Sequence, residues 1–328
     1  PTNRKEKREE PEKSRNREKR EQELSEKEEL EISAQAKEQF LQVKKRIQER
    51  EQREKEAHEK RIQELLDELN SLVGLANVKE EIQSLINLIK IRKLRSQMNI
   101  PEMDMSYHMV FTGSPGTGKT TVARLVAKIY KELGILSDGK VIETDRSGLV
   151  AGYVGQTAMK VHDIVEQALG GILFIDEAYS LVNPDVPNDF GSEAIDALVK
   201  LMEDHRDNLI VIVAGYTEEM KRFLKSNTGL ISRFNKFIEF RDYTKKELVE
   251  ILEVMTKDAG LKIEESAKKR VLNILYHKKG QEWAEFGNAR GIRNFFEKIV
   301  MNQANRLVKM ENPQKEDLIT LKKEDVVV

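Results

Sequence analysis

The sequence predicts an α/β fold in which a parallel sheet of five strands carries helices on both faces and an all-α subdomain follows. Three observations lead to this prediction. Short apolar segments alternate with segments of helical periodicity across residues 66–242, which is typical of βα units with parallel strands. Helical patterns then dominate the last region, residues 243–328, as far as about residue 310, and a short extended edge is predicted at residues 317–321 and 325–328. Residues 1–65 differ from both regions because charge dominates their composition, and they form an N-terminal extension.

The N-terminal extension, residues 1–65, is predicted to be a charged helix. More than half of its residues are Lys, Arg, Glu or Asp, and opposite charges four residues apart, such as Glu49 and Arg53, support a helix. Apolar residues recur up to Ile47 and then lapse until Ile62, which breaks the heptad pattern of a stable coiled coil. We expect disorder at the extreme N-terminus followed by a solvated helix. A coiled-coil docking arm is the alternative.

The first predicted strand, residues 107–112, leads into the segment GSPGTGKT and then into an amphipathic helix at residues 122–130. Glycines allow such a loop to turn its backbone N–H groups around the β-phosphate of a nucleotide. The Lys119 ammonium then meets the β- and γ-phosphates, and the Thr120 hydroxyl is placed to bind Mg²⁺. The predicted nucleotide-binding residues of this segment are Gly113, Ser114, Pro115, Gly116, Thr117, Gly118, Lys119, Thr120 and Thr121.

Four more strands are predicted at residues 140–144, 171–175, 209–214 and 236–240. The second of these is a continuous apolar run that ends in Asp176 and Glu177, as expected of a strand buried on both faces. Its carboxyl end lies at the ligand-binding edge of the sheet. There Asp176 can hold Mg²⁺ through water, and Glu177 can accept a proton from the attacking water or orient it. The sequence therefore predicts an enzyme that hydrolyses ATP, with ATP and Mg²⁺ as its ligands.

Composition excludes several other classes of function. The 328 residues carry a net charge of −1, so charge gives no case for nucleic acid or an anionic membrane as partner. The absence of cysteine excludes disulfides and thiolate chemistry, and the five histidines lack metal-binding spacing. The longest apolar runs are far shorter than the ~20 residues of a membrane helix. With no secretory signal visible, we expect a cytoplasmic protein.

The segment from residue 68 to residue 328 resembles the AAA+ ATPases of the CbbX and stage V sporulation protein K group. The resemblance rests on LVG at 72–74, GSPGTGKTTVARLVA from 113, YVGQT from 153, GGILFIDEAYSL from 170, IVAGYTEEM from 212, GLISRF from 229 and GNARGIRN from 287. It covers about four fifths of the chain. It implies a large α/β ATPase subdomain, a helical lid and a ring of identical subunits, a hexamer, that remodels a protein client.

The resemblance also implies roles for residues outside the phosphate loop. Val73 and Gly74 would lie over the adenine, where an apolar side chain and a bare backbone suit a flat heterocycle. Arg233 matches the arginine finger that reaches into the neighbouring subunit's site and stabilises transition-state charge. The lid sensor of the γ-phosphate would be Arg290, or Arg293 on the same helix face. Tyr216 or Thr217 would take the place of the sensor asparagine that other relatives carry.

The resemblance implies a loop in the central pore of the ring at Tyr153, Val154 and Gly155. An exposed aromatic ring can grip any peptide, and a glycine lets it swing. Burial of Tyr153 in the core is the alternative interpretation.

Other functions remain open on the sequence. Clamp loaders and helicase loaders share the phosphate loop, the finger and the lid arginine, but a basic aromatic patch for nucleic acid is not visible. A phosphotransferase would need an acceptor pocket. A scaffold that acts through the charged extension is a further alternative. The client cannot be read from the catalytic core, and the extension favours sporulation proteins over rubisco activation.

Overall fold

The computed structural model describes residues 10–101, 105–153, 155–182 and 189–327, with side chains from residue 37 onward. The chain forms two compact units, residues 1–61 and 62–328. Among the described helices, none combines the length and the apolar character that crossing a lipid bilayer requires.

Helix α1 (Glu10–Ser71) is a single helix of 62 residues. Its charge pairs lie one turn apart, as in the ion pair of 2.8 Å between Arg50 Nε and Glu54 Oε1. Phe40, Val43 and Ile47 are exposed on it. The end of the helix behaves differently, because Ile62 and the apolar residues after it are buried in the second unit. Packing of the globular unit thus begins inside the segment predicted as the extension.

The prediction of a five-stranded parallel sheet is confirmed, with each strand end within two residues of its predicted position. The strand order is β2-β3-β4-β1-β5, and every pair is parallel. In the register, Phe111 lies opposite Ala214 on one side and Ile238 on the other. The strands are β1 (Met109–Gly113), β2 (Val141–Thr144), β3 (Ile172–Ile175), β4 (Ile210–Gly215) and β5 (Lys236–Phe240).

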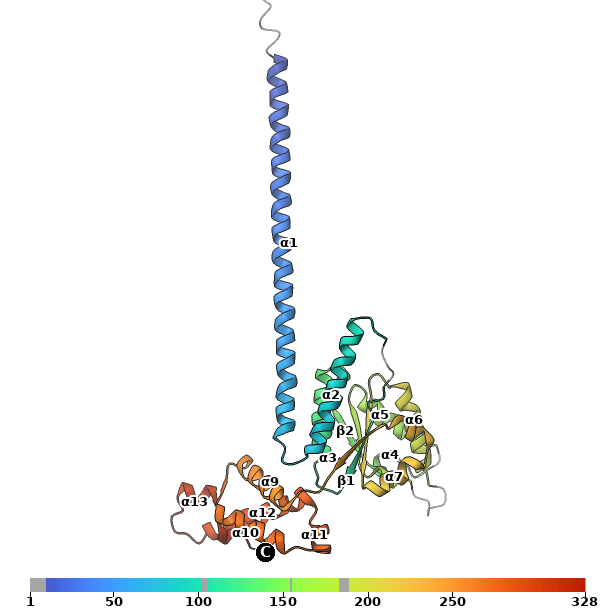
Figure 1. The fold of residues 1–328 in the computed structure, drawn as a ribbon, viewed down its shortest axis with the longest axis vertical. Helices are drawn as coiled ribbons and strands as arrows, with labels where there is room; N and C mark the ends of the chain where they lie inside the picture. Colours follow the sequence, from blue (N-terminus) through green and yellow to red (C-terminus); the bar gives the residue numbers. More distant parts are fainter. Residues whose placement is uncertain (1–9, 102–104, 154, 183–188, 328) are drawn as a thin grey trace, which may run out of the picture. The chain divides into compact units, whose positions relative to one another are not determined.

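Helices cover both faces of this sheet because alternate strand residues point to opposite sides (Figure 1). Met109 and Phe111 face a core shared with helices α2 and α3, whereas Val110 faces a core shared with α5, α6 and α7. The helices of this subdomain are α2 (Ala76–Gln97), α3 (Lys119–Glu132), α4 (Arg146–Leu149), α5 (Thr157–Ala168), η1 (Ala178–Leu181), α6 (Gly191–Asp204), α7 (Thr217–Lys225) and α8 (Thr228–Arg233).

The C-terminal subdomain is helical and begins at a capping box, in which Thr244 and Glu247 satisfy each other's backbone N–H groups. It also holds a two-residue parallel pair between β6 and β7, of which only β7 lies within the predicted extended edge. The extended edge predicted near residues 317–321 is short because α13 takes up residues 315–319. The elements are α9 (Lys245–Asp258), β6 (Lys262–Ile263), α10 (Glu265–His277), α11 (Gln281–Phe286), α12 (Asn288–Leu307), α13 (Lys315–Ile319), β7 (Thr320–Leu321) and η2 (Lys323–Asp325).

His108, just before β1, makes the stability of the fold depend on pH. It is 5% exposed, and its Nδ1 accepts a hydrogen bond of 3.0 Å from the Val211 N–H. Burial, followed by the nearby charge of Arg233, lowers the pKa of His108 to about 4. A histidine of the unfolded chain takes up its proton near pH 6.5. Between these values the unfolded state binds more protons, so stability falls as the pH falls.

Acidification from pH 7 to pH 4.5 should therefore cost the native chain about 2 to 3 kcal/mol more than it costs a His108→Asn variant. Asn suits this comparison because its Oδ1 can still accept the Val211 N–H. The measurement is the free energy of unfolding in urea at the two pH values for both proteins. Equal losses of the free energy of unfolding in the two proteins would show that the folded state does not keep His108 neutral.

Candidate active site

The phosphate loop joins β1 to α3, and three of its residues have backbone angles that favour glycine. The φ angles of Gly113, Gly116 and Gly118 are 143°, 73° and 96°. Lys119 Nζ donates hydrogen bonds of 2.9 Å to the carbonyls of Gly113 and Ser114. Burial lowers the pKa of Lys119, and the charge of Asp176 opposes this effect. The ammonium thus lies at the mouth of the loop, close to the acidic pair.

Thr117 is fully buried inside the loop. Its Oγ1 donates a hydrogen bond of 2.8 Å to the Ser114 carbonyl, and its own carbonyl accepts one of 3.2 Å from the Tyr243 hydroxyl. The side chain of Thr117 therefore braces the loop from within.

Asp176 and Glu177 follow β3 directly and are both exposed. Asp176 is fixed by its backbone, whose N–H donates a hydrogen bond of 2.8 Å to the Thr144 carbonyl of β2. Its Oδ1 accepts one of 3.0 Å from the Glu177 N–H. Glu177 has a φ of 47°, a left-handed conformation that is unfavourable for a non-glycine residue and is found most often at functional sites. Glu177 lines a cavity together with the phosphate loop.

A cavity of about 580 Å³ lies between the phosphate loop, the acidic pair and the lid. Its volume suits a nucleotide-sized ligand. The predicted site residues that line it are Val73, Gly113, Pro115, Gly116, Gly118, Lys119, Thr120, Thr121, Asp176, Glu177, Tyr216, Arg290 and Arg293. The structure thus brings together residues from the loop, two strand ends and the lid, which are far apart in the sequence.

The apolar end of the cavity contains Val73 and three lid residues that the sequence interpretation missed. Ile251, Val254 and Met255 lie on α9 at helical spacing, a periodic face that was the available signal. Gly74 is close by but does not line the cavity. Its φ is 63°, which favours glycine, and a Cβ there would lie 2.6 Å from Glu247 Oε1, so the carboxylate of Glu247 would have to shift.

Tyr216 and the two lid arginines lie on the remaining walls. Tyr216 begins α7 at the end of β4, is 41% exposed, and has its ring centroid 6.0 Å from that of Tyr179. Burial and then the charge of Glu177 raise the pKa of Tyr179 to about 12, so this neighbour stays a neutral phenol. Arg290 and Arg293 both line the cavity, and the charge of Arg290 is among the influences that lower the pKa of Lys119.

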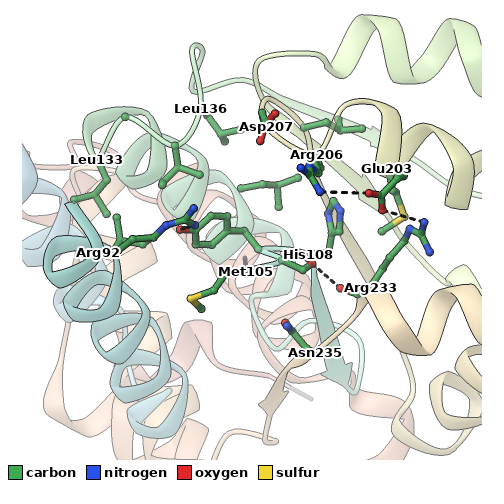
Figure 2. A pocket seen from close by; sticks show the side chains of 18 of the residues that line it. Arg92, Met105, His108, Leu133, Leu136, Glu203, Arg206, Asp207, Arg233 and Asn235 are labelled. Carbon is green, nitrogen blue, oxygen red and sulfur yellow. Dashed lines mark hydrogen bonds and ion pairs between the residues drawn. The ribbon is translucent and has the colours of Figure 1, made fainter. Parts of the chain in front are cut away.

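Arg233 lies away from this cavity, near the amino-terminal ends of the strands, whereas the cavity lies at their carboxyl ends. It lines a second cavity of about 620 Å³ beside the start of β1 (Figure 2). Its Nη2 forms an ion pair of 3.1 Å with Glu203, and its carbonyl accepts a hydrogen bond of 2.6 Å from the Ser106 hydroxyl. Its Nε is buried with no hydrogen-bond partner within the described part of the chain.

Two residues of the predicted pore loop, Tyr153 and Gly155, also lie outside the cavity. The Tyr153 side chain is 74% exposed, so the alternative of a buried Tyr153 does not hold. Gly155 has a φ of 78°, and Val154 lies outside the described residues.

The residues present fit a magnesium nucleotide. Within the described ranges, no group of three acidic or histidine side chains could hold a metal ion. Thr120 and Asp176 both line the cavity and offer oxygen atoms. Mg²⁺ at such sites takes one or two protein ligands and completes its coordination with water and phosphate oxygens. Two oxygen-bearing side chains beside a phosphate loop match this requirement.

The fold and the cavity define a phosphate-loop ATPase with a helical lid, and the comparisons agree. A model of the ATPase family associated with various cellular activities (AAA) matches residues 109–242, and the AAA lid domain matches residues 244–328. Solved structures of RuvB mutants from Thermotoga maritima share the fold. One of them has a TM-score of 0.52 at 20% identity and covers 79% of this chain and 69% of its own.

Curated relatives identify the group more narrowly. A protein CfxQ homolog of Galdieria sulphuraria is 44% identical over 81% of this chain and 88% of its own. Stage V sporulation protein K of Bacillus subtilis is 41% identical over 81% and 83%. Protein CbbX of Cereibacter sphaeroides is 40% identical over 74% and 79%. The chain belongs to the CbbX and stage V sporulation protein K group of AAA+ ATPases, and it is an ATP-hydrolysing enzyme.

Proposed function

We propose that this ATPase works as a hexameric ring of identical subunits that remodels a protein client. The observation that carries the proposal is the position of Arg233. Ser106, which binds the Arg233 carbonyl, precedes β1, whereas the phosphate loop follows β1. The seven steps along the chain from Ser106 to Gly113 span about 23 Å at 3.3 Å per residue of strand. Arg233 is therefore out of reach of its own nucleotide, which supports a role at the site of a neighbouring subunit.

The chemistry follows from the roles of the side chains around the cavity. The loop amides and Lys119 bind the β- and γ-phosphates, and Thr120 and Asp176 hold Mg²⁺, which neutralises phosphate charge when bound. Glu177 takes a proton from the attacking water or orients it, and Tyr216 helps to position that water.

Two arginines complete the site. Arg233 of the adjacent subunit stabilises the charge that develops on the transferred phosphoryl group. Arg290 on the lid contacts the γ-phosphate and so distinguishes ATP from ADP. Arg293 lines the same cavity, but the electrostatic effect of Arg290 on Lys119 favours Arg290 for this role.

The client is a protein that the loop around Tyr153 pulls through the ring. The exposed aromatic side chain and the left-handed glycine two residues later support this role. Two relatives carry names that point to different processes, rubisco activation and sporulation. We favour a client like those of sporulation proteins, because the charged helix α1 does not resemble a feature specific to rubisco activation.

Replacing Tyr153 with Ala should leave basal ATP hydrolysis within about twofold of native and abolish its stimulation by an unfolded polypeptide, because the side chain lies outside the nucleotide cavity. The measurement is the ATPase rate with and without unstructured casein. Tyr153→Phe, which keeps the ring, is the matched control and should retain stimulation. Full stimulation of the alanine variant would contradict the gripping role.

A further inference from the structure

The start of α12 in the lid is bonded directly to the phosphate loop. Three successive loop carbonyls accept hydrogen bonds from the lid and the residues that lead into it. These bonds are Asn288 Nδ2 to Pro115 O at 3.4 Å, Ala289 N to Gly116 O at 3.1 Å, and Tyr243 Oη to Thr117 O at 3.2 Å. A phosphate loop uses its N–H groups to bind the ligand, so its carbonyls remain available for hydrogen bonds to other parts of the protein. Through these bonds, a change of the loop on ligand binding can reach the lid.

Asn288 is the centre of this contact and is 9% exposed. Besides Pro115, its carboxamide binds two residues of the segment that leads into α9, Asp242 and Tyr243. Its Oδ1 accepts a hydrogen bond of 3.0 Å from the Tyr243 N–H, and its Nδ2 donates one of 3.0 Å to Asp242 Oδ1. One side chain thus ties together the loop, the segment leading into the lid and the first residue of α12. Its φ of 55° lies in the left-handed region, which asparagine tolerates better than most residues.

Gly116 shows how close this packing is. A Cβ at Gly116 would lie 2.4 Å from the Gly287 carbonyl oxygen and 2.9 Å from the Arg290 N–H nitrogen. Backbone therefore packs against backbone, with no flexible side chain between loop and lid to absorb a shift. Any change in the loop at Gly116 must be followed by the first turn of α12, which carries Arg290.

We propose that Asn288 is a positioning residue of the ATP site, which holds the first turn of α12, and with it Arg290, in a fixed place on the phosphate loop. The inference rests on the proposed role of Arg290 as the sensor of the γ-phosphate. ADP is held by the loop amides and Lys119, and it has no γ-phosphate for Arg290 to contact. ATP also uses Arg290, so loss of the anchor weakens ATP binding selectively.

The test is an Asn288→Gly variant of the full chain, because glycine keeps the left-handed backbone and removes only the carboxamide. Its affinity for a non-hydrolysable ATP analogue should fall about tenfold, the worth of one hydrogen bond to a charged group, and its affinity for ADP should change less than twofold. Asn288→Asp keeps the acceptor for the Tyr243 N–H but loses both donated bonds, and it should show the same selective loss.

The matched control is Asn99→Gly, which changes an asparagine with the same φ of 55° remote from the site. It should bind both nucleotides as the native chain does. A structural readout comes from Trp283, the single tryptophan of the chain, which lies in α11 five residues before Asn288. Its fluorescence change on addition of the ATP analogue should be smaller in Asn288→Gly than in the native protein.

Combination with Arg290→Ala separates the two proposals. If Asn288 acts through Arg290, the double variant should bind the analogue no more weakly than Arg290→Ala alone. The positioning role would be overturned if the losses of affinity multiplied in the double variant. It would also be overturned if Asn288→Gly kept the native ratio of ATP to ADP affinity. If Arg290→Ala itself leaves that ratio unchanged, the sensor assignment of the proposed function fails as well, and the positioning role falls with it.

Discussion

A Glu177→Gln variant should lose ATP turnover by about 10² to 10⁴-fold while it still binds ATP, because the amide cannot accept the proton of the attacking water. Gln is close in size to Glu, so the surroundings that hold the left-handed backbone at this position stay the same. The ammonium of Lys119 and the loop amides, which are the proposed ligands of the phosphates, are unchanged. The measurements are the steady-state rate of phosphate release and the dissociation constant for ATP.

Glu166→Gln is the matched control for this prediction. Glu166 is an exposed acid on α5, does not line the nucleotide cavity, and should tolerate the same chemical change with little effect. Turnover close to native in Glu177→Gln would show that another group activates the water. Loss of ATP binding in the same variant would instead show that Glu177 contributes to the ground-state complex.

Replacement of Arg233 with Ala should lower turnover by about 10³ to 10⁵-fold, the range that arginine fingers contribute in other nucleotide hydrolases. Binding of ATP by the variant subunit should be preserved, because Arg233 lies at the far edge of the sheet from its own phosphate loop. Arg233→Lys keeps the charge but loses the planar fork of the guanidinium, so it should recover only a part of the rate.

Mixing two inactive proteins tests whether Arg233 acts on the neighbouring subunit. An Arg233→Ala subunit retains Glu177, and a Glu177→Gln subunit retains Arg233, so a mixed ring contains some complete sites. At equal amounts, half of the sites keep the acid and half of the fingers keep the arginine. About a quarter of the native rate should therefore return if sites act independently. A mixture that stays inactive would contradict action in trans, provided that the two proteins assemble together.

The sequence predicted the elements whose structure depends on residues that are close to one another in the sequence. The five strands lie within two residues of their predicted ends, because apolar runs and loop glycines are local signals. The phosphate loop and the pair Asp176 and Glu177 were found in the same way, and they line one cavity. Charge spacing likewise predicted a helix in the N-terminal extension, although the burial of Ile62 near its end was missed.

The lid contacts could not be predicted, because they join residues far apart in the chain. Asn288 and Pro115 are separated by 173 positions, and Tyr243 and Thr117 by 126. No periodicity connects such pairs. The sequence placed Thr117 among the ligand-binding residues, whereas its side chain is buried within the loop.

The sequence by itself determined the residue types on which the proposed chemistry rests: a loop for phosphates, a pair of acids for metal and water, and arginines for charge. The tertiary structure decided which of these residues share a cavity. It placed Arg233 at the opposite edge of the sheet and bonded the first turn of α12 to the loop carbonyls. The physical reason is that residue type and spacing fix local backbone geometry, whereas the packing of the sheet against the lid fixes distances between remote segments.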